Sequence, residues 1–268
     1  NNEAAMRGKC KLLINWLLVV GVSVLVVIDI VWLDAYSNNI SEIDDCGRTD
    51  VPCLKIHACA NFPSSKIADF KITNTKPHNV TDAVQQTQVE ICHSSRGFHI
   101  SSQAHARHVF SPYTRCNDPV FIRSEVLEVF IAPVRTATDN PISYWEIDVA
   151  PTGAMWVGIS HNDRGNASNC PRCPPAGTLN CSGLNHFDPY RFKVSTRRTA
   201  VGWSDRLFVP FSLFAPAGFG PAWPLYRANF YRYDYPAGPG GPYHLSGWSP
   251  TFDPSFHVPA RFGVLRLV

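Results

Sequence analysis

One stretch of this chain, residues 144–159, constrains its fold more than any other. The first half places alternate side chains on opposite faces: Tyr144, Glu146 and Asp148 on one, and Trp145, Ile147 and Val149 on the other. A period of two is typical of a β-strand with one face in a core. Pro151-Thr152-Gly153 then predicts a turn, because proline presets φ and glycine accepts a positive φ. Together with the β-rich run of residues 155–159, this stretch predicts a hairpin at the centre of a β-sandwich.

Further strand patterns follow one another after residue 60. They are separated by turns, which suits a chain with 22 prolines and 17 glycines. The predicted strands are residues 87–92 and 97–102 (a hairpin with a turn at 93–96), 124–133, 203–214, 226–233 and 262–268. We therefore expect one all-β domain over residues 61–268, interrupted by a cysteine-rich loop insertion at 161–190.

An apolar run from Leu12 to Leu33 precedes this domain. A helix needs about 20 apolar residues to span a bilayer, so the run predicts a single transmembrane helix over 12–33. A removed signal peptide and a buried core helix are the alternatives. The flank 1–11 is basic and the residues after the run are acidic, which predicts a cytosolic or matrix-side N-terminus. Asp29 within the run suggests a polar contact with a neighbouring membrane helix.

Cysteine usage indicates an oxidising compartment, whether extracellular, a secretory lumen or an intermembrane space. Eight of the nine cysteines lie beyond residue 45, and three of them belong to a predicted linker, 34–60. The predicted disulfide cysteines are Cys46, Cys53, Cys59, Cys92, Cys116, Cys170, Cys173 and Cys181. Cys170, Cys173, Cys181 and His186 would also suit a zinc site. Glycosylation sequons occur at Asn39, Asn79, Asn166 and Asn180.

The motifs that would indicate an enzyme are missing from the sequence. It contains no Gly-x-Ser-x-Gly elbow, no phosphate-binding glycine loop, no HExxH and no redox-cofactor fingerprint. The net charge of +3 forms no basic stripe, so nucleic acid is not an expected partner. No cofactor is expected. The strand carboxylates Glu125, Glu128, Glu146 and Asp148 are compatible with a structural calcium site or with a solvated rim.

Several of these strands, in order, resemble carbohydrate-binding module family 9-like domains, which are related to DOMON domains. The matching pieces are Val89-Glu90-Ile91 with Gly97-Phe98-His99-Ile100, Glu125–Phe130, Tyr144-Trp145-Glu146-Ile147 with Trp156, Tyr226–Arg232, Gly247-Trp248-Ser249-Pro250-Thr251 and Phe256–Gly263. The resemblance covers residues 85–268. It implies a jelly-roll-like antiparallel β-sandwich that binds carbohydrate without hydrolysing it.

Sugar binding requires flat aromatic faces surrounded by hydrogen-bonding groups. The candidate residues are Trp248, Trp203, Trp223, Tyr231 and Tyr243 for stacking, and Asn229, Arg232 and Glu128 for hydrogen bonds. We expect a single-pass membrane protein that displays a glycan-binding sandwich on the non-cytosolic side. The alternative is a structural accessory subunit of a multi-protein membrane complex, for example in an organelle inner membrane, in which the sandwich contacts protein subunits.

Overall fold

The structure is a computed structural model. It describes residues 46–268 except 60–63, 168–169, 174–176, 178–190 and 220–222. The predicted membrane helix over 12–33, its basic flank and the first part of the linker lie outside the described residues. Among the residues that are described, no helix is both long enough and apolar enough to cross a bilayer.

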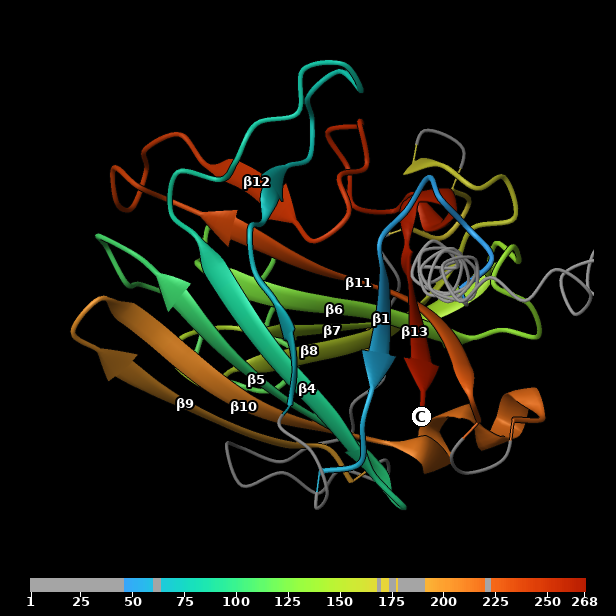
Figure 1. Ribbon diagram of the computed structural model, residues 1–268. Helices are drawn as coiled ribbons and strands as arrows, with labels where there is room; N and C mark the ends of the chain where they lie inside the picture. The colour runs from blue at the N-terminus through green and yellow to red at the C-terminus, as the bar shows by residue number, and fades with distance from the viewer. Residues whose placement is uncertain (1–45, 60–63, 168–169, 174–176, 178–190, 220–222) are drawn as a thin grey trace, which may run out of the picture. The chain divides into compact units, whose positions relative to one another are not determined.

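Two β-sheets make up the described part of the chain (Figure 1). The larger, eight-stranded sheet has the order β1-β13-β11-β6-β7-β8, with β12 paired to β11 and β3 paired to β12. Its strands are β1 (Cys53–Ile56), β3 (Lys71–Ile72), β6 (Val126–Pro133), β7 (Ser143–Val149), β8 (Met155–His161), β11 (Leu225–Asp234), β12 (His244–Gly247) and β13 (Gly263–Leu267). Among these strands the pairing of β1 with β13 is parallel and the others are antiparallel.

The smaller, five-stranded sheet is antiparallel and has the order β2-β4-β5-β10-β9. Its strands are β2 (Ser65–Ile67), β4 (Thr87–Ser94), β5 (Gly97–His105), β9 (Lys193–Thr199) and β10 (Gly202–Pro210). Two short 3-10 helices, η2 (Phe211–Ala217) and η3 (Pro259–Arg261), precede β11 and β13. Figure 1 shows β9, β10, β5 and β4 as one layer and β11, β6, β7 and β8 as another. The chain is therefore a β-sandwich, as predicted.

The main core lies between the two sheets. One set of alternating side chains from each strand faces it, for example Leu127, Val129 and Ile131 of β6 opposite strands that carry Val89 and Ile100. This agrees with the alternation read from the sequence. The other face of β6 and β7 is also buried, because loops cover it. Of the two alternatives for these carboxylates, a calcium site or a solvated rim, the solvated rim is therefore wrong for Glu128, Glu146 and Asp148.

The predicted hairpins at 87–102 and 144–159 are confirmed, as are strands at 126–133, 225–234 and 263–267. Two boundaries differ from the prediction. The strand expected over 203–214 ends at Pro210, because proline lacks the N–H that a ladder requires, and η2 begins at Phe211. The linker expected over 34–60 contains β1, which pairs with β13, so the sandwich begins before residue 61.

Disulfides join Cys46 to Cys53, Cys59 to Cys92 and Cys170 to Cys173. Cys116 is also disulfide-bonded, whereas Cys181 and His186 lie outside the described residues. Cys170 and Cys173 are bonded to each other and offer no thiolates to a metal, which excludes the predicted zinc set. The disulfides agree with an oxidising compartment.

A carboxylic acid, Asp205, faces the interior from β10. It is 5% exposed, and its cross-strand neighbour is Ser102 of β5. Burial raises the pKa of Asp205 from 3.8 to about 7, although hydrogen bonds from Ser102 oppose the rise. The folded state therefore binds a proton more tightly than the unfolded state. Asp205 lowers stability progressively as the pH rises from about 4 to about 7.

We predict that Asp205→Asn makes the free energy of unfolding less dependent on pH. Each unit by which the pKa is raised corresponds to about 1.4 kcal/mol. Between pH 4 and pH 8, the free energy of unfolding of the variant should therefore rise by a few kcal/mol relative to that of the wild type. Urea unfolding at several pH values measures this, with the exposed Asp163→Asn as the matched control. Parallel pH curves for the wild type and Asp205→Asn would contradict the prediction.

Candidate functional site

The outer face of the larger sheet, which points away from the main core, carries an aromatic and acidic layer. Cross-strand register places Glu128 of β6 beside Asp148 of β7 on one side and Tyr231 of β11 on the other. In the next row of the same face, Phe130 lies opposite Glu146. These side chains are buried, so the layer forms a second interior beneath the loops.

Three carboxyl groups meet in this layer. One oxygen each of Glu128, Glu146 and Asp148 lies within 4.8 Å of the other two, and the residues are 3%, 3% and 0% exposed. Burial, followed by repulsion from neighbouring carboxylates, raises the pKa of Glu128 and of Asp148 well above their usual range. Burial likewise raises the pKa of Glu146 to about 8. Such a set can keep protons at neutral pH or bind a cation.

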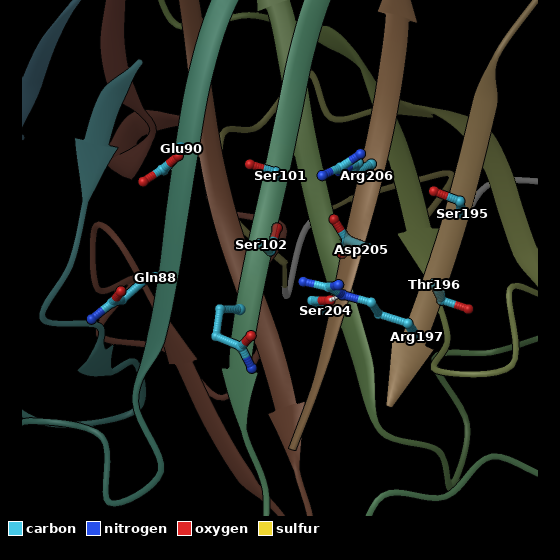
Figure 2. A pocket seen from close by; sticks show the side chains of 11 residues that line it. Gln88, Glu90, Ser101, Ser102, Ser195, Thr196, Arg197, Ser204, Asp205 and Arg206 are labelled. Atoms are coloured by element: carbon cyan, nitrogen blue, oxygen red, sulfur yellow. Dashed lines mark hydrogen bonds between the residues drawn. The ribbon is translucent and has the colours of Figure 1, made fainter. Parts of the chain in front are cut away.

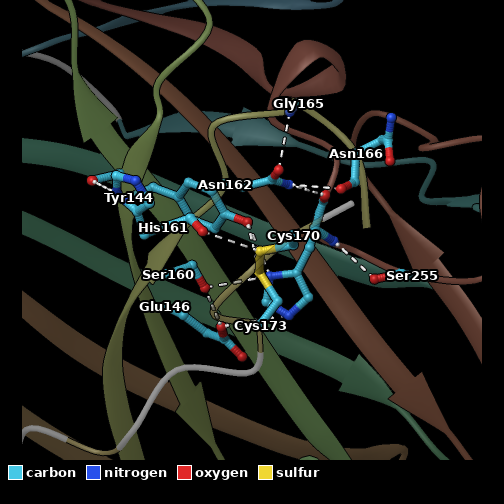
Figure 3. Close-up of a disulfide and its surroundings, with 12 residues drawn as sticks. Tyr144, Glu146, Ser160, His161, Asn162, Gly165, Asn166, Cys170, Cys173 and Ser255 are labelled. Carbon is cyan, nitrogen blue, oxygen red and sulfur yellow. Dashed lines mark hydrogen bonds and ion pairs between the residues drawn. A yellow bond between two sulfur atoms is a disulfide. The ribbon is translucent and has the colours of Figure 1, made fainter. Parts of the chain in front are cut away.

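At one end of the cluster, polar groups surround Glu146. The Ser160 hydroxyl donates to Glu146 Oε2 at 3.2 Å, and His257 Nε2 lies 3.8 Å from the same oxygen. His257 Nδ1 lies 3.0 Å from the hydroxyl of Tyr144. Burial lowers the pKa of His257 to about 4, so the imidazole is neutral and does not offset the carboxylates. Figure 3 shows the Cys170–Cys173 disulfide next to these groups.

Stacked rings fill the rest of the layer. Tyr231 stacks on Phe256 with ring centroids 4.1 Å apart, and Phe130 meets Tyr231 edge to face at 5.2 Å. Tyr144 continues the row by stacking on Phe130 at 5.6 Å. Aromatic pairs of this kind contribute roughly 0.5–1.5 kcal/mol each beyond the area they bury. Tyr231 is fully buried in this packing and has no ring face open to a ligand.

A pocket of about 870 Å³ opens beside this layer, between the loops at 110–123 and 235–243. Five aromatic rings line it: Phe110, Phe121, Tyr233, Tyr235 and Tyr243. Tyr243 is 54% exposed, and its ring centroid lies 5.6 Å from that of Tyr233 and 5.9 Å from that of Tyr235. Arg123 adds an exposed guanidinium to the lining. Flat rings with hydroxyl and guanidinium groups between them suit a ligand that is both apolar and hydroxylated.

Tyr233 connects the pocket to the acidic layer. It lies on the outer face of β11 two residues after Tyr231, and it is partly buried. Burial, followed by the charge of Glu128, raises the pKa of its hydroxyl above the usual range. Its hydroxyl therefore stays protonated at neutral pH and remains a hydrogen-bond donor.

A second hollow, of about 340 Å³, lies on the smaller sheet and is polar (Figure 2). Serine, threonine, glutamine and charged side chains of β4, β5, β9 and β10 line it, and no aromatic residue of the described chain segments does. Arg197 Nε donates to the Ser204 hydroxyl at 3.1 Å across this surface. A polar outer face is usual for an antiparallel sheet that faces water, and without rings it is the weaker candidate for sugar stacking.

Two predicted sugar-binding residues lie in the interior. Trp203 is fully buried, and its Nε1 donates to Glu125 Oε2 at 3.4 Å. Arg232 is also fully buried and forms ion pairs with Glu125 at 2.9 Å and with Asp234 at 3.3 Å. Neither side chain has an exposed surface, so Trp203 and Arg232 are no longer candidates for contact with a ligand.

Three further candidates support the structure of loops. Asn229 is buried, donates to the carbonyl of Ser249 at 2.8 Å and accepts from the Ser249 amide at 3.0 Å. Trp248 is partly buried and packs against the main core. Its indole ring lies close to Gly263, because a Cβ atom added to that glycine would be 2.4 Å from the ring. Trp223 donates from Nε1 to the carbonyl of Val134 at 2.7 Å. These contacts lie away from the pocket lining.

Of the eight candidates, Tyr243 lines the pocket, and Glu128 and Tyr231 lie in the layer beside it. Sequence reasoning missed Phe110, Phe121, Tyr233 and Tyr235, which come from two loops and the end of β11. The only signal in the sequence was the density of aromatics around the Gly- and Pro-rich segment 236–242. Of the sequons, Asn79 is exposed and Asn166 is partly buried, whereas Asn39 and Asn180 lie outside the described residues.

Comparison with known proteins supports the fold. No protein-family model matches the chain. A protein of Arthroderma benhamiae described as "Extracellular protein" is 24% identical over 215 residues, which cover 79% of this chain and 86% of that protein. Solved structures with a similar fold include the following two. One, a protein of Bacteroides uniformis provisionally described as carbohydrate-binding, has a TM-score of 0.55 and 15% identity, over 81% of this chain and 99% of that one.

The other is a family 9 carbohydrate-binding module of Caldicellulosiruptor kristjanssonii in complex with glucose. It has a TM-score of 0.50 and 9% identity, and the match covers 81% of this chain and 95% of that one. At such identities the likeness concerns the fold alone. The expected family 9-like sandwich fold is confirmed.

The buried ion pairs of Arg232 lead to a stability prediction. Arg232→Met should lower the free energy of unfolding by about 3–5 kcal/mol, because Glu125 would remain buried without its positive partner. Urea unfolding measures the loss, and the exposed Arg206→Met is the matched control, expected to stay within about 0.5 kcal/mol of the wild type. Equal stability of the two variants would show that Arg232 has no structural role.

Proposed function

We propose that this protein binds carbohydrate, without chemically changing it, in the aromatic pocket formed by the loops 110–123 and 235–243. The observation that carries the proposal is the half-exposed ring of Tyr243, held against Tyr233 and Tyr235 at the mouth of the pocket. The apolar C–H face of a pyranose stacks on such rings, and its hydroxyls hydrogen-bond to groups around them. The relation to DOMON domains and a jelly-roll topology belong to the same proposal.

The pocket supplies both kinds of contact. Its rings offer the apolar surface, and the exposed residues Tyr243 and Arg123 add a hydroxyl and a guanidinium for polar contacts. Its volume of about 870 Å³ is within the range of small-molecule sites, which suits a short stretch of an oligosaccharide. The solved structures with this fold are described as carbohydrate-binding or contain glucose, which supports the ligand class.

We predict that Tyr243→Ala weakens glycan binding about tenfold, because losing the ring removes on the order of 1.4 kcal/mol of stacking and buried area. Tyr243→Phe keeps the ring and should bind nearly as the wild type does. A glycan array identifies the ligand, starting from glucose and neutral gluco-oligosaccharides, and calorimetry measures the dissociation constants.

Phe208→Ala is the matched control, because it removes a partly buried ring from the outer face of the smaller sheet. Its binding should equal that of the wild type. Binding that survives Tyr243→Ala and disappears in Phe208→Ala would place the site on the other sheet. No binding to any glycan would refute the proposed function.

We further propose that residues 12–33 anchor the protein in a membrane, with the sandwich on the non-cytosolic side, as the apolar run and its basic flank suggest. The protein should then stay in the membrane pellet after alkaline carbonate extraction, and deleting residues 1–33 should release it. Release of the intact chain by carbonate would contradict the anchor.

The membrane fraction also tests the alternative that the protein is an accessory subunit of a membrane complex. Asp29 within the apolar run supports this alternative. Stoichiometric co-purification of other membrane subunits in mild detergent, together with no glycan binding, would favour that alternative. A monomeric chain that binds glycan would exclude it.

A further inference from the structure

The acidic layer beneath the loops contains more negative charge than its surroundings compensate. Glu128, Glu146 and Asp148 are each at most 3% exposed. Among the residues that the structure describes, no lysine or arginine forms an ion pair with any of the three, and the imidazole of His257 lies 3.8 Å from Glu146 Oε2. Unpaired carboxylates in a dry interior cost several kcal/mol each. A folded protein with these groups therefore needs protons or a cation at this position.

One side chain in particular points to a missing ligand. Asp148 is fully buried, and neither of its carboxyl oxygens has a hydrogen-bond partner among the described residues. An oxygen of Asp148 nevertheless lies within 4.8 Å of oxygens on both Glu128 and Glu146, so its carboxyl group is aimed between them. Glu128 Oε1 likewise has no hydrogen-bond partner in the described ranges. Buried polar atoms are nearly always hydrogen-bonded, so several orphaned oxygens around one point require an explanation.

The spacing of the three carboxyl groups matches a metal centre. Calcium binds oxygen ligands at about 2.3–2.6 Å, so two oxygens on opposite sides of the ion lie about 4.6–5.2 Å apart. The three oxygens lie within 4.8 Å of one another, which lets one ion contact all three. The Ser160 hydroxyl, 3.2 Å from Glu146 Oε2, adds a neutral oxygen at the edge of the set. Carboxylates that bind through both oxygens can supply the remaining ligands of a six- to eight-coordinate ion.

The chemistry of the donors selects the class of metal. All three acidic ligands offer hard oxygen atoms, which suit calcium, magnesium and manganese better than zinc or copper. The nearby sulfur atoms of Cys170 and Cys173 form a disulfide, so neither of these two cysteines offers a thiolate. His257 Nδ1 is already in contact with the hydroxyl of Tyr144 at 3.0 Å. Calcium accepts irregular, flexible ligand sets, whereas magnesium requires a near-ideal octahedron.

We propose that Glu128, Glu146 and Asp148 bind one calcium ion in the interior of the outer layer. The three ligands come from two strands, β6 and β7, that pair directly. The ion therefore offsets two of the three negative charges on the face of the larger sheet on which Phe130 and Tyr144 pack, and it stabilises that layer. The site is separate from the sugar contacts proposed for Tyr243, so either proposal can fail without the other.

The experiment uses the whole chain, freed of metal with a chelator and then titrated with calcium alone. Calorimetry should show one equivalent bound, and the melting temperature should rise with calcium concentration because the ion binds the folded state. Terbium is a second probe, since Trp156 lies directly opposite Asp148 in the β7–β8 ladder and should sensitise terbium luminescence. Calcium should then quench that luminescence by competition.

Two variants locate the site, so that one poorly folding protein does not end the test. Asp148→Asn and Glu128→Gln each keep the shape of the side chain and remove a charge. Each should weaken calcium binding at least tenfold and abolish the shift in melting temperature. Asp163→Asn, which removes an exposed carboxylate, is the matched control and should respond to calcium as the wild type does.

Several results would overturn the proposal. One is a wild-type protein with no calcium-dependent shift at millimolar calcium, which would mean that protons alone satisfy the cluster. Another is calcium binding that both variants retain, which would place the ion elsewhere. Equal loss in Asp163→Asn would show nonspecific binding to surface acids. Glycan binding is measured separately, so its presence or absence does not affect this result.

Discussion

The central strands of the larger sheet are buried on both faces, and the rest of the structure depends on how their polar groups are satisfied. β6, β7 and β11 each show an almost unbroken run of buried residues. On the inner face, Arg232 is paired with Glu125 and Asp234. On the outer face, the carboxylates of Glu128, Glu146 and Asp148 have no lysine or arginine partner within the described part of the chain. Buried charges on the inner face thus lie next to opposite charges, whereas three acidic groups lie together on the outer face.

Side chains of β11 also fix the loops that cover the outer face. Arg227 donates to the carbonyls of Phe262, Asp139 and Ala260 at 2.9, 2.7 and 3.1 Å, so one guanidinium holds two separate loops. Asn229 holds the turn at Ser249 in the same manner. Asn229, which the sequence suggested as a sugar contact, therefore stabilises a turn inside the protein.

The proposed binding site lies where two loops meet the end of β11. A rigid sheet positions Tyr233, and two loops bring Phe110, Phe121 and Tyr243 to it. Binding sites in β-sandwiches are often made in this way, because loops vary while the scaffold holds their ends in place. The interior acidic layer and the open aromatic pocket share Tyr233 as a border, yet one suits a small hard cation and the other a hydroxylated ring.

The sequence alone determined the β-sandwich, its central hairpin and most strand positions, because alternation of polar and apolar residues depends only on local geometry. It could not show that Trp203 and Arg232 are interior, since a ring or guanidinium in a strand has the same pattern whether it faces a core or a ligand. It also could not show that Glu128 and Asp148 are buried, because the loops that cover them come from distant parts of the chain. The tertiary structure decided both points. It brought together Tyr243, Tyr233 and Phe110, which local patterns cannot associate, because packing between distant segments sets which side chains share a pocket.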